Sequence, residues 1–416
     1  MKDSGVDWIG EIPNEWQVIK CKHLATVQAG FPFDSAKFSN SEGTPLIRIR
    51  DITSGYTQTR YTGEYNSEYI VSKGDLLIGM DGDFNIRMWQ GTNALLNQRC
   101  CRVVSNSEIE LSFLYYCLPF HLEITNNLAY ATTVKHLSNS DILNAPVPYP
   151  QKCTRERIIS YLDSKCSEID KVVEQTRATI EEYKKLKQAI ITEAVTKGVR
   201  GPRSMKPSGV EWIGDIPEEW SRDKIGRVCN LIGSGTTPKF DRFDLSSADI
   251  PWIQSGDLYS AYLHDVKTHV TRDIIAAHSA LKVYEPPFIA VAMYGASIGN
   301  TSISSIRACV NQACCVLAPG SFNLSYLYYV IMACKPYFMY QGEGGGQQNI
   351  SQEKIKQTWI PVPSPSEQQE IATYLDTKCA EIDRIIEKKE QLIEELGSYK
   401  KSLIYEYVTG KKEVTT

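Results

Sequence analysis

The sequence lacks the features that mark membrane-spanning or disulfide-rich secreted chains. No apolar run reaches the roughly 18 residues that a spanning helix needs, and the stretch before Pro13 has no signal-peptide core. The twelve cysteines include no C-x-x-C pair. We therefore expect a cytoplasmic protein without disulfides, without a structural metal and without a membrane partner.

The sequence also has no surplus of positive charge. It contains 45 Lys and Arg against 49 Asp and Glu, for a net charge of −4. Residues 1–150 contain 12 basic against 16 acidic residues, and residues 205–363 contain 13 against 14. Because affinity for nucleic acid depends on neutralising phosphates, a DNA-binding role would need local basic patches and a partner that supplies further positive charge. We therefore expect this chain alone to bind DNA weakly.

Familiar catalytic motifs are incomplete. Gly233–Pro238 begins like a dinucleotide-binding loop but has proline at the third glycine position, and Gly342–Gly346 lacks the Gly-Lys-Ser/Thr of a phosphate loop. Asn144–Tyr149 only loosely resembles the Asn-Pro-Pro-Tyr motif of amino-methyltransferases. No spacing singles out a Ser-His-Asp triad, and His264 and His269 have no partner at zinc-like spacing. We predict no catalytic site.

What the sequence does contain is a duplication. SGVDWIGEIPNEW at Ser4–Trp16 returns as SGVEWIGDIPEEW at Ser208–Trp220, and YLDSKCSEID at Tyr161–Asp170 returns as YLDTKCAEID at Tyr374–Asp383. A repeat this long predicts two similar modules, each large enough for its own core. The adjacent cysteines Cys100–Cys101 and Cys314–Cys315 recur in apolar runs, and we interpret them as strand residues that point to opposite faces.

Each module is followed by a sequence with a heptad-like apolar seam. Steps of three and four residues connect the seam positions, and Lys187 and Lys400 stand at matched seam positions (400 − 187 = 213). Ser366 with Gln369 is predicted to form a capping box, while Gly198 and Gly410 end the helices. The apolar or small seam residues are Ile158, Leu162, Cys166, Ile169, Val173, Thr176, Ile180, Tyr183, Ile190 and Ala194 in the first helix and Ile371, Leu375, Cys379, Ile382, Ile386, Ile393, Leu396, Leu403 and Tyr407 in the second.

The predicted fold class is α/β (α+β), with two globular domains in inverted orientation separated by an antiparallel pair of long coiled-coil-like helices. Neither helix can expose its seam to water, and the connectivity requires them to run antiparallel when they pair. A helix of this length would span about 65 Å. The predicted boundaries are 1–153 for the first globular domain, 154–198 for the first helix, 199–365 for a linker and the second domain, 366–410 for the second helix and 411–416 for a tail.

Differences between the copies suggest where recognition could differ. Arg48 aligns with Gln254 and Asp51 with Asp257, each at a shift of 206. Arginine pairs bidentately with guanine and glutamine with adenine, so this position could read different bases, although two exposed polar side chains at strand ends are a simpler explanation. A polar loop before Leu137 aligns with one before Ile350, where a solvated loop is the simpler explanation. The predicted DNA-binding residues are Arg48, Arg50, Arg60, Arg87, Lys135, His136, Lys239, Arg242, Gln254, Gln347, Gln348 and Asn349.

These features together resemble a known family. The doubled W-I-G-x-I-P entry, the pair NQRCC at Asn97–Cys101 and NQACC at Asn311–Cys315, and the run Ser364–Asp383 resemble the DNA-specificity subunits of Type I restriction–modification systems over essentially the whole chain. The first helix departs from the family pattern at Lys152–Arg157, which weakens its predicted cap.

The resemblance implies that each globular domain is a target recognition domain that reads one half of a split, asymmetric DNA sequence. It also implies that the helices set the gap and dock two methyltransferase subunits, which use S-adenosylmethionine. A separate restriction subunit, a helicase-nuclease that uses ATP and Mg²⁺, completes the system. This chain itself would be non-catalytic and bind no cofactor.

Two alternatives remain open at this point. A stand-alone adenine methyltransferase would need the cofactor loop and catalytic motif that are incomplete here. A protein-interaction scaffold would fit the acidic charge balance, but it gives no reason for the modules to diverge at polar loop positions.

Overall fold

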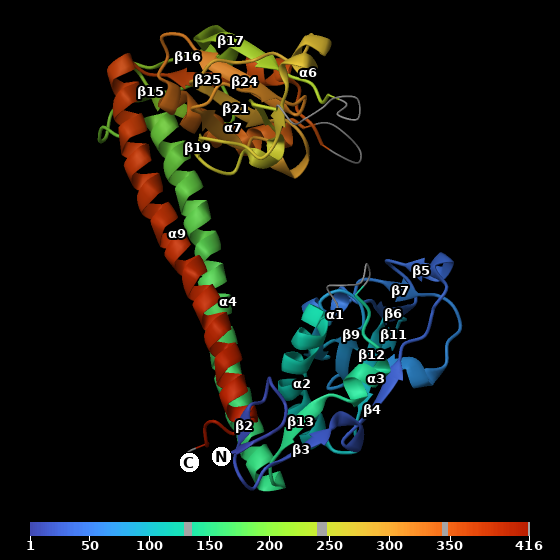
Figure 1. Ribbon diagram of the computed structural model, residues 1–416. Coiled ribbons are helices and arrows are strands. Elements are labelled where there is room, and N and C mark those ends of the chain that lie inside the picture. Colours follow the sequence, from blue (N-terminus) through green and yellow to red (C-terminus); the bar gives the residue numbers. More distant parts are fainter. Residues whose placement is uncertain (129–134, 239–247, 343–347, 415–416) are drawn as a thin grey trace. The chain divides into compact units, whose positions relative to one another are not determined.

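The computed structural model describes residues 1–128, 135–238, 248–342 and 348–414 (Figure 1). The chain divides into two compact units. The first unit comprises Met1–Gln175 and Gln391–Thr416, and the second comprises Thr176–Glu390. Both long helices cross this division, so each unit contains one globular module and a segment of each helix. Among the described residues, no helix is long and apolar enough to span a bilayer.

The first unit is a mixed α/β structure. A four-stranded antiparallel sheet has the order β10-β9-β12-β4, and a five-stranded sheet has the order β5-β7-β6-β11-β8, in which β6 and β11 are parallel. Two further pairs, β1–β2 and β3–β13, are antiparallel. The strands are β1 (Lys2–Asp3), β2 (Glu11–Ile12), β3 (Gln17–Lys20), β4 (Thr26–Ala29), β5 (Phe38–Ser39), β6 (Thr44–Ile47), β7 (Arg60–Tyr61), β8 (Ile70–Val71), β9 (Leu76–Gly79), β10 (Ile86–Met88), β11 (Ala94–Leu96), β12 (Cys100–Val104) and β13 (Pro146–Tyr149), and the helices are α1 (Asp51–Ser54), α2 (Glu108–Leu128), α3 (Asn139–Leu143) and the first part of α4 (Lys152–Lys197).

The second unit repeats this plan. Its main sheet has the order β17-β24-β21-β22-β19, and a three-stranded sheet has the order β20-β18-β23, in which β18 and β23 are parallel. The strands are β14 (Met205–Pro207), β15 (Asp215–Pro217), β16 (Ser221–Lys224), β17 (Cys229–Ser234), β18 (Ile250–Ile253), β19 (Tyr262–Leu263), β20 (His269–Val270), β21 (Phe288–Ala292), β22 (Thr301–Ser304), β23 (Cys309–Val310), β24 (Cys314–Pro319) and β25 (Trp359–Val362), and the helices are α5 (Ile225–Val228), α6 (Arg272–Ala277), α7 (Leu324–Tyr340), α8 (Gln352–Gln357) and α9 (Pro365–Val408).

The paired cysteines confirm the strand prediction. All four are buried, on β12 and β24. Cys101 belongs to the cluster that includes α2, whereas Cys100 belongs to a separate cluster on the other face of the strand. Cys314 and Cys315 are divided between two clusters in the same way. Each sheet is therefore buried on both faces at this point, as the alternation of strand side chains requires.

Apolar packing of the helix segments against the modules forms the main core of each unit. In the first unit, Leu162 of α4 and Leu403 of α9 share a cluster with Phe113 of α2, and Figure 1 shows α2 beside the strands of its sheet. In the second unit, Ala194 of α4 and Leu375 of α9 share a cluster with residues of α7. The early part of each helix therefore packs with the late part of the other, which confirms the antiparallel pairing.

The repeated W-I-G-x-I-P segments cover the ends of the helices. Ile9 and Ile12 are buried with Tyr407 and Val408 at the end of α9, and the Lys411 ammonium donates a hydrogen bond to the Ile9 carbonyl at 2.6 Å. In the second unit the corresponding Ile213 and Ile216 share a cluster with the end of α4. The duplicated entry motif is thus a docking segment for a helix end.

The two seam lysines have equivalent partners. Lys400 Nζ lies 2.6 Å from Asp170 Oδ1 in the first unit, and Lys187 Nζ lies 2.7 Å from Asp383 Oδ2 in the second. All four side chains retain some exposure, so these pairs contribute little free energy to stability. They match one position of α4 with one position of α9 in each unit, as expected for lysines that help set register.

The capping prediction for the second helix was wrong. The helix begins at Pro365, and the Glu367 amide donates to the Ser364 hydroxyl at 3.4 Å. Proline suits the first helical position because its fixed φ is already helical and it has no amide to satisfy. The capping serine is therefore Ser364 and not Ser366. Lys197 and Val408 end the helices, with Gly198 and Gly410 at positive φ, as expected.

The first helix compensates for its unusual start with a buried arginine. Arg155 hydrogen-bonds the Pro150 carbonyl, and its second terminal nitrogen lies 2.8 Å from Glu110 Oε1. In the second copy Gln368 donates to the equivalent Pro363 carbonyl at 3.0 Å. Different side chains therefore anchor both helix starts to the preceding proline segment.

We predict that Glu367→Ala destabilises the second unit by about 2 kcal/mol, because the change leaves the buried Trp220 indole N–H without its acceptor and leaves Arg203 paired with the exposed Glu219. Glu367 is 2% exposed, accepts a hydrogen bond from Trp220 Nε1 at 2.9 Å and lies 2.6 Å from the Arg203 guanidinium. Urea unfolding measures the change. Glu370→Ala is the matched control, since Glu370 pairs with Arg200 at the surface of the same helix. Equal transition midpoints for the two variants would contradict the prediction.

Candidate nucleic-acid interface

The turn after the parallel strand is held by the same aspartate hydrogen bond in both modules. The Arg48 amide donates to Asp51 Oδ2 at 2.9 Å, and the Gln254 amide donates to Asp257 Oδ2 at 2.8 Å. Each turn follows a strand whose last backbone carbonyl accepts a hydrogen bond from the backbone N–H of an asparagine. Asn97 donates to Ile47 at 3.3 Å in the first module, and Asn311 donates to Ile253 at 2.9 Å in the second. The predicted equivalence of Arg48 and Gln254 is confirmed.

The two side chains at this position have different surroundings. Arg48 is half-buried, and among the described residues its buried Nε has no hydrogen-bond partner. Gln254 is also half-buried, and its Nε2 donates to Thr268 Oγ1 at 3.0 Å. A base that bound Gln254 through the same amide nitrogen would have to compete with Thr268.

Each turn is followed by an exposed tyrosine that was not among the predicted site residues. Ser54 Oγ donates to the Tyr56 carbonyl and Ser260 Oγ to the Tyr262 carbonyl, both at 2.8 Å. Tyr56 is 60% exposed and Tyr262 47%. The signal was the spacing D-x-x-S-x-Y, which starts at Asp51 and at Asp257. An exposed aromatic ring thus follows the divergent position in both modules.

A second cluster in the first module joins three distant segments. Asp81 follows β9, Arg99 precedes β12 and His136 lies in the polar loop. His136 Nδ1 is 2.8 Å from Asp81 Oδ1, and the Arg99 guanidinium forms an ion pair with Asp81 Oδ2. Although burial alone raises the pKa of the Asp81 carboxyl, hydrogen bonds from His136 and Arg99 hold it below its usual value of 3.8.

The second module has the same backbone arrangement with other side chains. The Met80 amide donates to the Arg99 carbonyl and the Met293 amide to the Ala313 carbonyl, both at 2.8 Å. The bridge between Asp81 and His136 corresponds to one between Tyr294 and Asn349. The predicted alignment of the polar loops is therefore confirmed at His136 and Asn349, and a charged cluster in one module corresponds to uncharged groups in the other.

Both features of the first module lie at the same end of its sheets. Arg48 follows β6, and the segment from Asn97 to Arg99 connects its parallel neighbour β11 to β12. Burial raises the pKa of the Cys100 thiol to about 12, with further contributions from Cys101, Asp51 and Asp81. Gly79, which lies two residues before Asp81, pairs with Cys100 at the start of β12, so the cluster lies at this end of the sheets as well.

The remaining predicted residues are more dispersed. Arg50 is exposed on the turn beside Asp51. Arg60 lies opposite Pro45, toward the start of β6, and donates to the Gly43 carbonyl, so the structure does not bring it to Arg48. Arg87 hydrogen-bonds the Thr53 carbonyl from β10.

In the polar loops, Lys135 is half-buried and Gln348 is exposed, with its carbonyl accepting from the Gly295 amide at 2.8 Å. Lys239, Arg242 and Gln347 lie outside the described residues.

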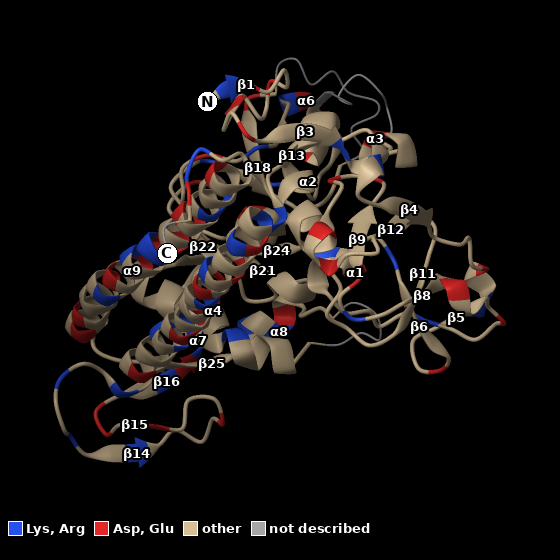
Figure 2. Ribbon diagram, turned by 90° about the horizontal axis from the view of Figure 1, so that it is seen from below, with Lys and Arg blue, Asp and Glu red and all other residues tan. Residues whose placement is uncertain are grey.

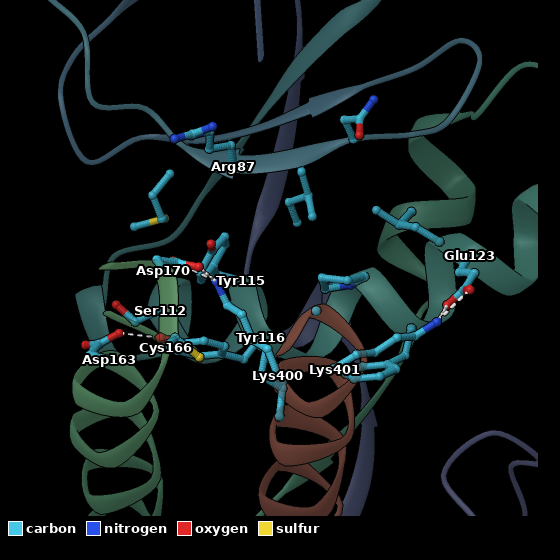
Figure 3. Close-up of a pocket in the computed structure, with 18 of the residues that line it drawn as sticks. Arg87, Ser112, Tyr115, Tyr116, Glu123, Asp163, Cys166, Asp170, Lys400 and Lys401 are labelled. Carbon is cyan, nitrogen blue, oxygen red and sulfur yellow. Dashed lines mark hydrogen bonds and ion pairs between the residues drawn. The ribbon is translucent and has the colours of Figure 1, made fainter. Parts of the chain in front are cut away.

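Arg87 also borders a cleft of about 880 Å³ in the first unit (Figure 3). Across from Arg87 lie Tyr115 and the Asp170–Lys400 ion pair, and Tyr116 of the same cleft donates to Asp163 Oδ1 at 2.5 Å. The labelled carboxylates of this cleft, including Glu123, are all engaged by a lysine or a tyrosine. Asp163, Asp170 and Glu123 are therefore each held by a neighbouring donor of the same cleft.

Charge of both signs is interspersed along the two long helices, as Figure 2 shows for α4 and α9. Within the described ranges, no group of three or more His, Cys, Asp and Glu side chains could hold a metal ion. The positions at which the two modules differ, described above, carry polar and charged groups at one end of each sheet.

Comparisons with known proteins agree with this duplicated arrangement. The family model for the Type I restriction modification DNA specificity domain matches residues 13–182 and again 217–395. The chain is similar to the EcoBI specificity subunit of Escherichia coli, with 26% identity across 98% of this chain and 89% of that protein. It is also similar to the MjaVIII specificity subunit of Methanocaldococcus jannaschii, with 23% identity across 97% and 94%.

A solved structure shares the fold. It comes from work on complex assembly and conformational transition of the type I R-M system, and it matches with a TM-score of 0.67 and 18% identity over 97% of this chain and 100% of the other. None of these comparisons supports the stand-alone methyltransferase alternative. With two copies of the domain covering most of its length, the chain belongs to the family of DNA specificity subunits of Type I restriction–modification systems.

Proposed function

We propose that each module reads one half of a bipartite, asymmetric DNA sequence, through the turn after β6 or β18 and the adjoining polar loop. The observation that carries this proposal is the combination of one backbone arrangement with different side chains. The hydrogen bonds of Asp51 and Asp257 to the turns are the same to within 0.1 Å, whereas the presented residues are Arg48 in one turn and Gln254 in the other. A shared scaffold with divergent polar groups is what two readers of different bases require.

The predicted DNA-binding residues divide by position under this proposal. Arg48, Gln254, His136 and Asn349 stand at matched positions and are assigned to base reading. Arg50 is exposed beside the turn and is assigned to a phosphate. Gln348 lies directly before Asn349, and Lys135 lies directly before His136. Arg60 and Arg87 are bound to backbone carbonyls, Arg60 to Gly43 away from the turn and Arg87 to Thr53 within it, and they are the weaker candidates.

The same proposal makes this chain a non-catalytic subunit in the cytoplasm. The reactions would belong to partners: methyltransferase subunits that use S-adenosylmethionine and restriction subunits that use ATP and Mg²⁺. The interspersed charge of the chain supports a requirement for partners, because phosphate contacts need an excess of positive charge that this sequence does not have.

Each unit has two exposed apolar side chains at matched positions, which supports a partner that binds once to each unit. Val172 and Tyr399 are exposed in the first unit, close in sequence to the Asp170–Lys400 pair. Ile385 and Leu186, which are their equivalents at a shift of 213, are exposed in the second unit beside Asp383 and Lys187. Exposed apolar side chains that gather in a patch mark interaction surfaces, and their recurrence at matched positions of both units supports one partner that binds twice. We assign these two pairs to docking of the two methyltransferase subunits.

Exchanging a module tests the reading function. When residues 205–363 are replaced by the equivalent module of a related specificity subunit, we expect only one half of the methylated sequence to change. Within this module, Gln254→Arg is expected to replace an adenine preference with a guanine preference at one base pair, a discrimination of roughly 1–3 kcal/mol. Methylated sites are read by sequencing DNA from cells that express each variant with its methyltransferase. A module exchange that changes both half-sites would contradict modular reading. A Gln254→Arg variant that methylates the same sequence as the unmodified chain would contradict only the assignment of Gln254 to base reading.

Charge substitution tests the docking assignment. Tyr399→Glu places a carboxylate in the exposed pair of the first unit and is expected to lower the number of bound methyltransferase subunits from two to one, because a buried unpaired charge is costly. Leu186→Glu should have the same effect in the second unit, and the double variant should bind none. Native mass spectrometry counts the subunits. The control is Tyr374→Glu, at an exposed tyrosine near the start of α9. Retention of two subunits by the double variant would contradict the assignment.

A further inference from the structure

The loop from Asn97 to Cys100 has a different conformation from its counterpart in the second module. Both loops connect a strand of one sheet to a strand of the other, and in both the cysteine amide donates to the asparagine carbonyl, at 3.2 Å. In the second module the loop is relaxed, since the Ala313 amide also donates to Asn311 Oδ1 at 3.0 Å. In the second module the side-chain oxygen of the half-buried Asn311 thus has a hydrogen-bond donor within the loop.

In the first module the asparagine side-chain oxygen does not have this hydrogen bond. Arg99 has φ = +69°, a left-handed conformation that side chains other than glycine rarely adopt. Asn97 Oδ1 is buried and, among the described residues, has no hydrogen-bond partner. Both features cost free energy and persist only when the surroundings impose them. The first module therefore holds Arg99 in a conformation that the same loop does not need for folding.

Asp81 is the group that holds Arg99 in place. Its carboxylate is only 17% exposed, yet it pairs with two side chains that reach outward, Arg99 at 65% exposed and His136 at 59%. The carboxylate thus lies beneath an exposed guanidinium, at the sheet end where Arg48 also lies. A guanidinium has five N–H donors in a fixed planar arrangement, and pairing with a carboxylate fixes the direction in which it points.

We propose that Arg99 is a base-reading residue of the first module, specific for guanine, and that Asp81 is its positioning residue. This inference rests on the proposed function and adds a specificity determinant to it. Arginine pairs bidentately with the O6 and N7 atoms of guanine in the major groove. The equivalent residue in the second module, Ala313, has no donor on its side chain, so that module reads no guanine at this position.

Arg99→Gly is the sharpest test because glycine adopts φ = +69° without strain, so the loop keeps its path while the guanidinium is lost. The variant is expressed with its methyltransferase subunits, and methylation is measured on a library with randomised half-sites. We expect the preference for guanine at one position of the first half-site to fall by roughly 5- to 150-fold. Asp81→Asn should weaken the preference at the same position by a smaller factor, and preferences in the second half-site should not change, which shows that both variants fold and assemble.

Arg307→Ala is the matched control, since Arg307 forms an exposed ion pair with Glu285 at 2.7 Å outside the proposed surface of the second module. It should leave both half-sites unchanged. An unchanged guanine preference in Arg99→Gly would overturn the inference. So would an equal loss of methylation at all first half-sites, which indicates a phosphate contact. If the unmodified chain directs methylation to no bipartite sequence, the proposed function itself fails.

Discussion

Burial of the helix seams is the constraint on which the rest of the structure depends. Residues such as Leu162 and Leu375 are fully buried, and a helix of more than 40 residues with such a stripe is not stable alone in water. Each unit solves this problem by bringing together the early part of one helix, the late part of the other and a globular module. The W-I-G-x-I-P segment then covers the end of a helix with Ile9 and Ile12, or with Ile213 and Ile216. A module and a helix end from a distant part of the chain are therefore parts of one core.

This shared core explains why the two modules can differ where they do. Both copies share the parallel strand pair at the turn, the aspartate that caps the turn and the bridge to the polar loop, so side chains at the outer ends can change without loss of the fold. Arg48 corresponds to Gln254, and the charged group of Asp81, Arg99 and His136 corresponds to Tyr294, Ala313 and Asn349. Family membership identifies the chain as a specificity subunit, and these positions are where we locate its specificity.

The repeated parts of the sequence predicted most of the fold. The seam residues, the buried cysteine pairs and the equivalence of Arg48 with Gln254 followed from matched spacing, because two copies of one motif report the same local structure. The helix start at Pro365 was not predicted, because Ser366 with Gln369 and Ser364 with Glu367 both fit a capping box. Only the neighbouring proline decides between them. Arg155 showed that a start without the usual pattern can be anchored by a buried cation.

The candidate site was less predictable because it depends on contacts between distant segments. Asp81, Arg99 and His136 are separated by 18 and 37 residues, and no periodicity connects them. The difference between Arg99 and Ala313 was visible in the paired NQRCC and NQACC motifs, but its meaning depends on a backbone dihedral angle that residue identity alone does not give. Arg60 shows the opposite case, an arginine that seemed suitable from the sequence but lies away from the matched turn.

The most direct test of the account is site-specific crosslinking to DNA. A photoreactive amino acid is placed at position 48 in one variant and at position 254 in another, and each is assembled with methyltransferase subunits on the target sequence. If the two modules are separate readers, position 48 crosslinks only to one half-site and position 254 only to the other. Crosslinks from both positions to the same half-site, or none from either position to DNA, would contradict the claim that the two modules are separate readers built on one scaffold.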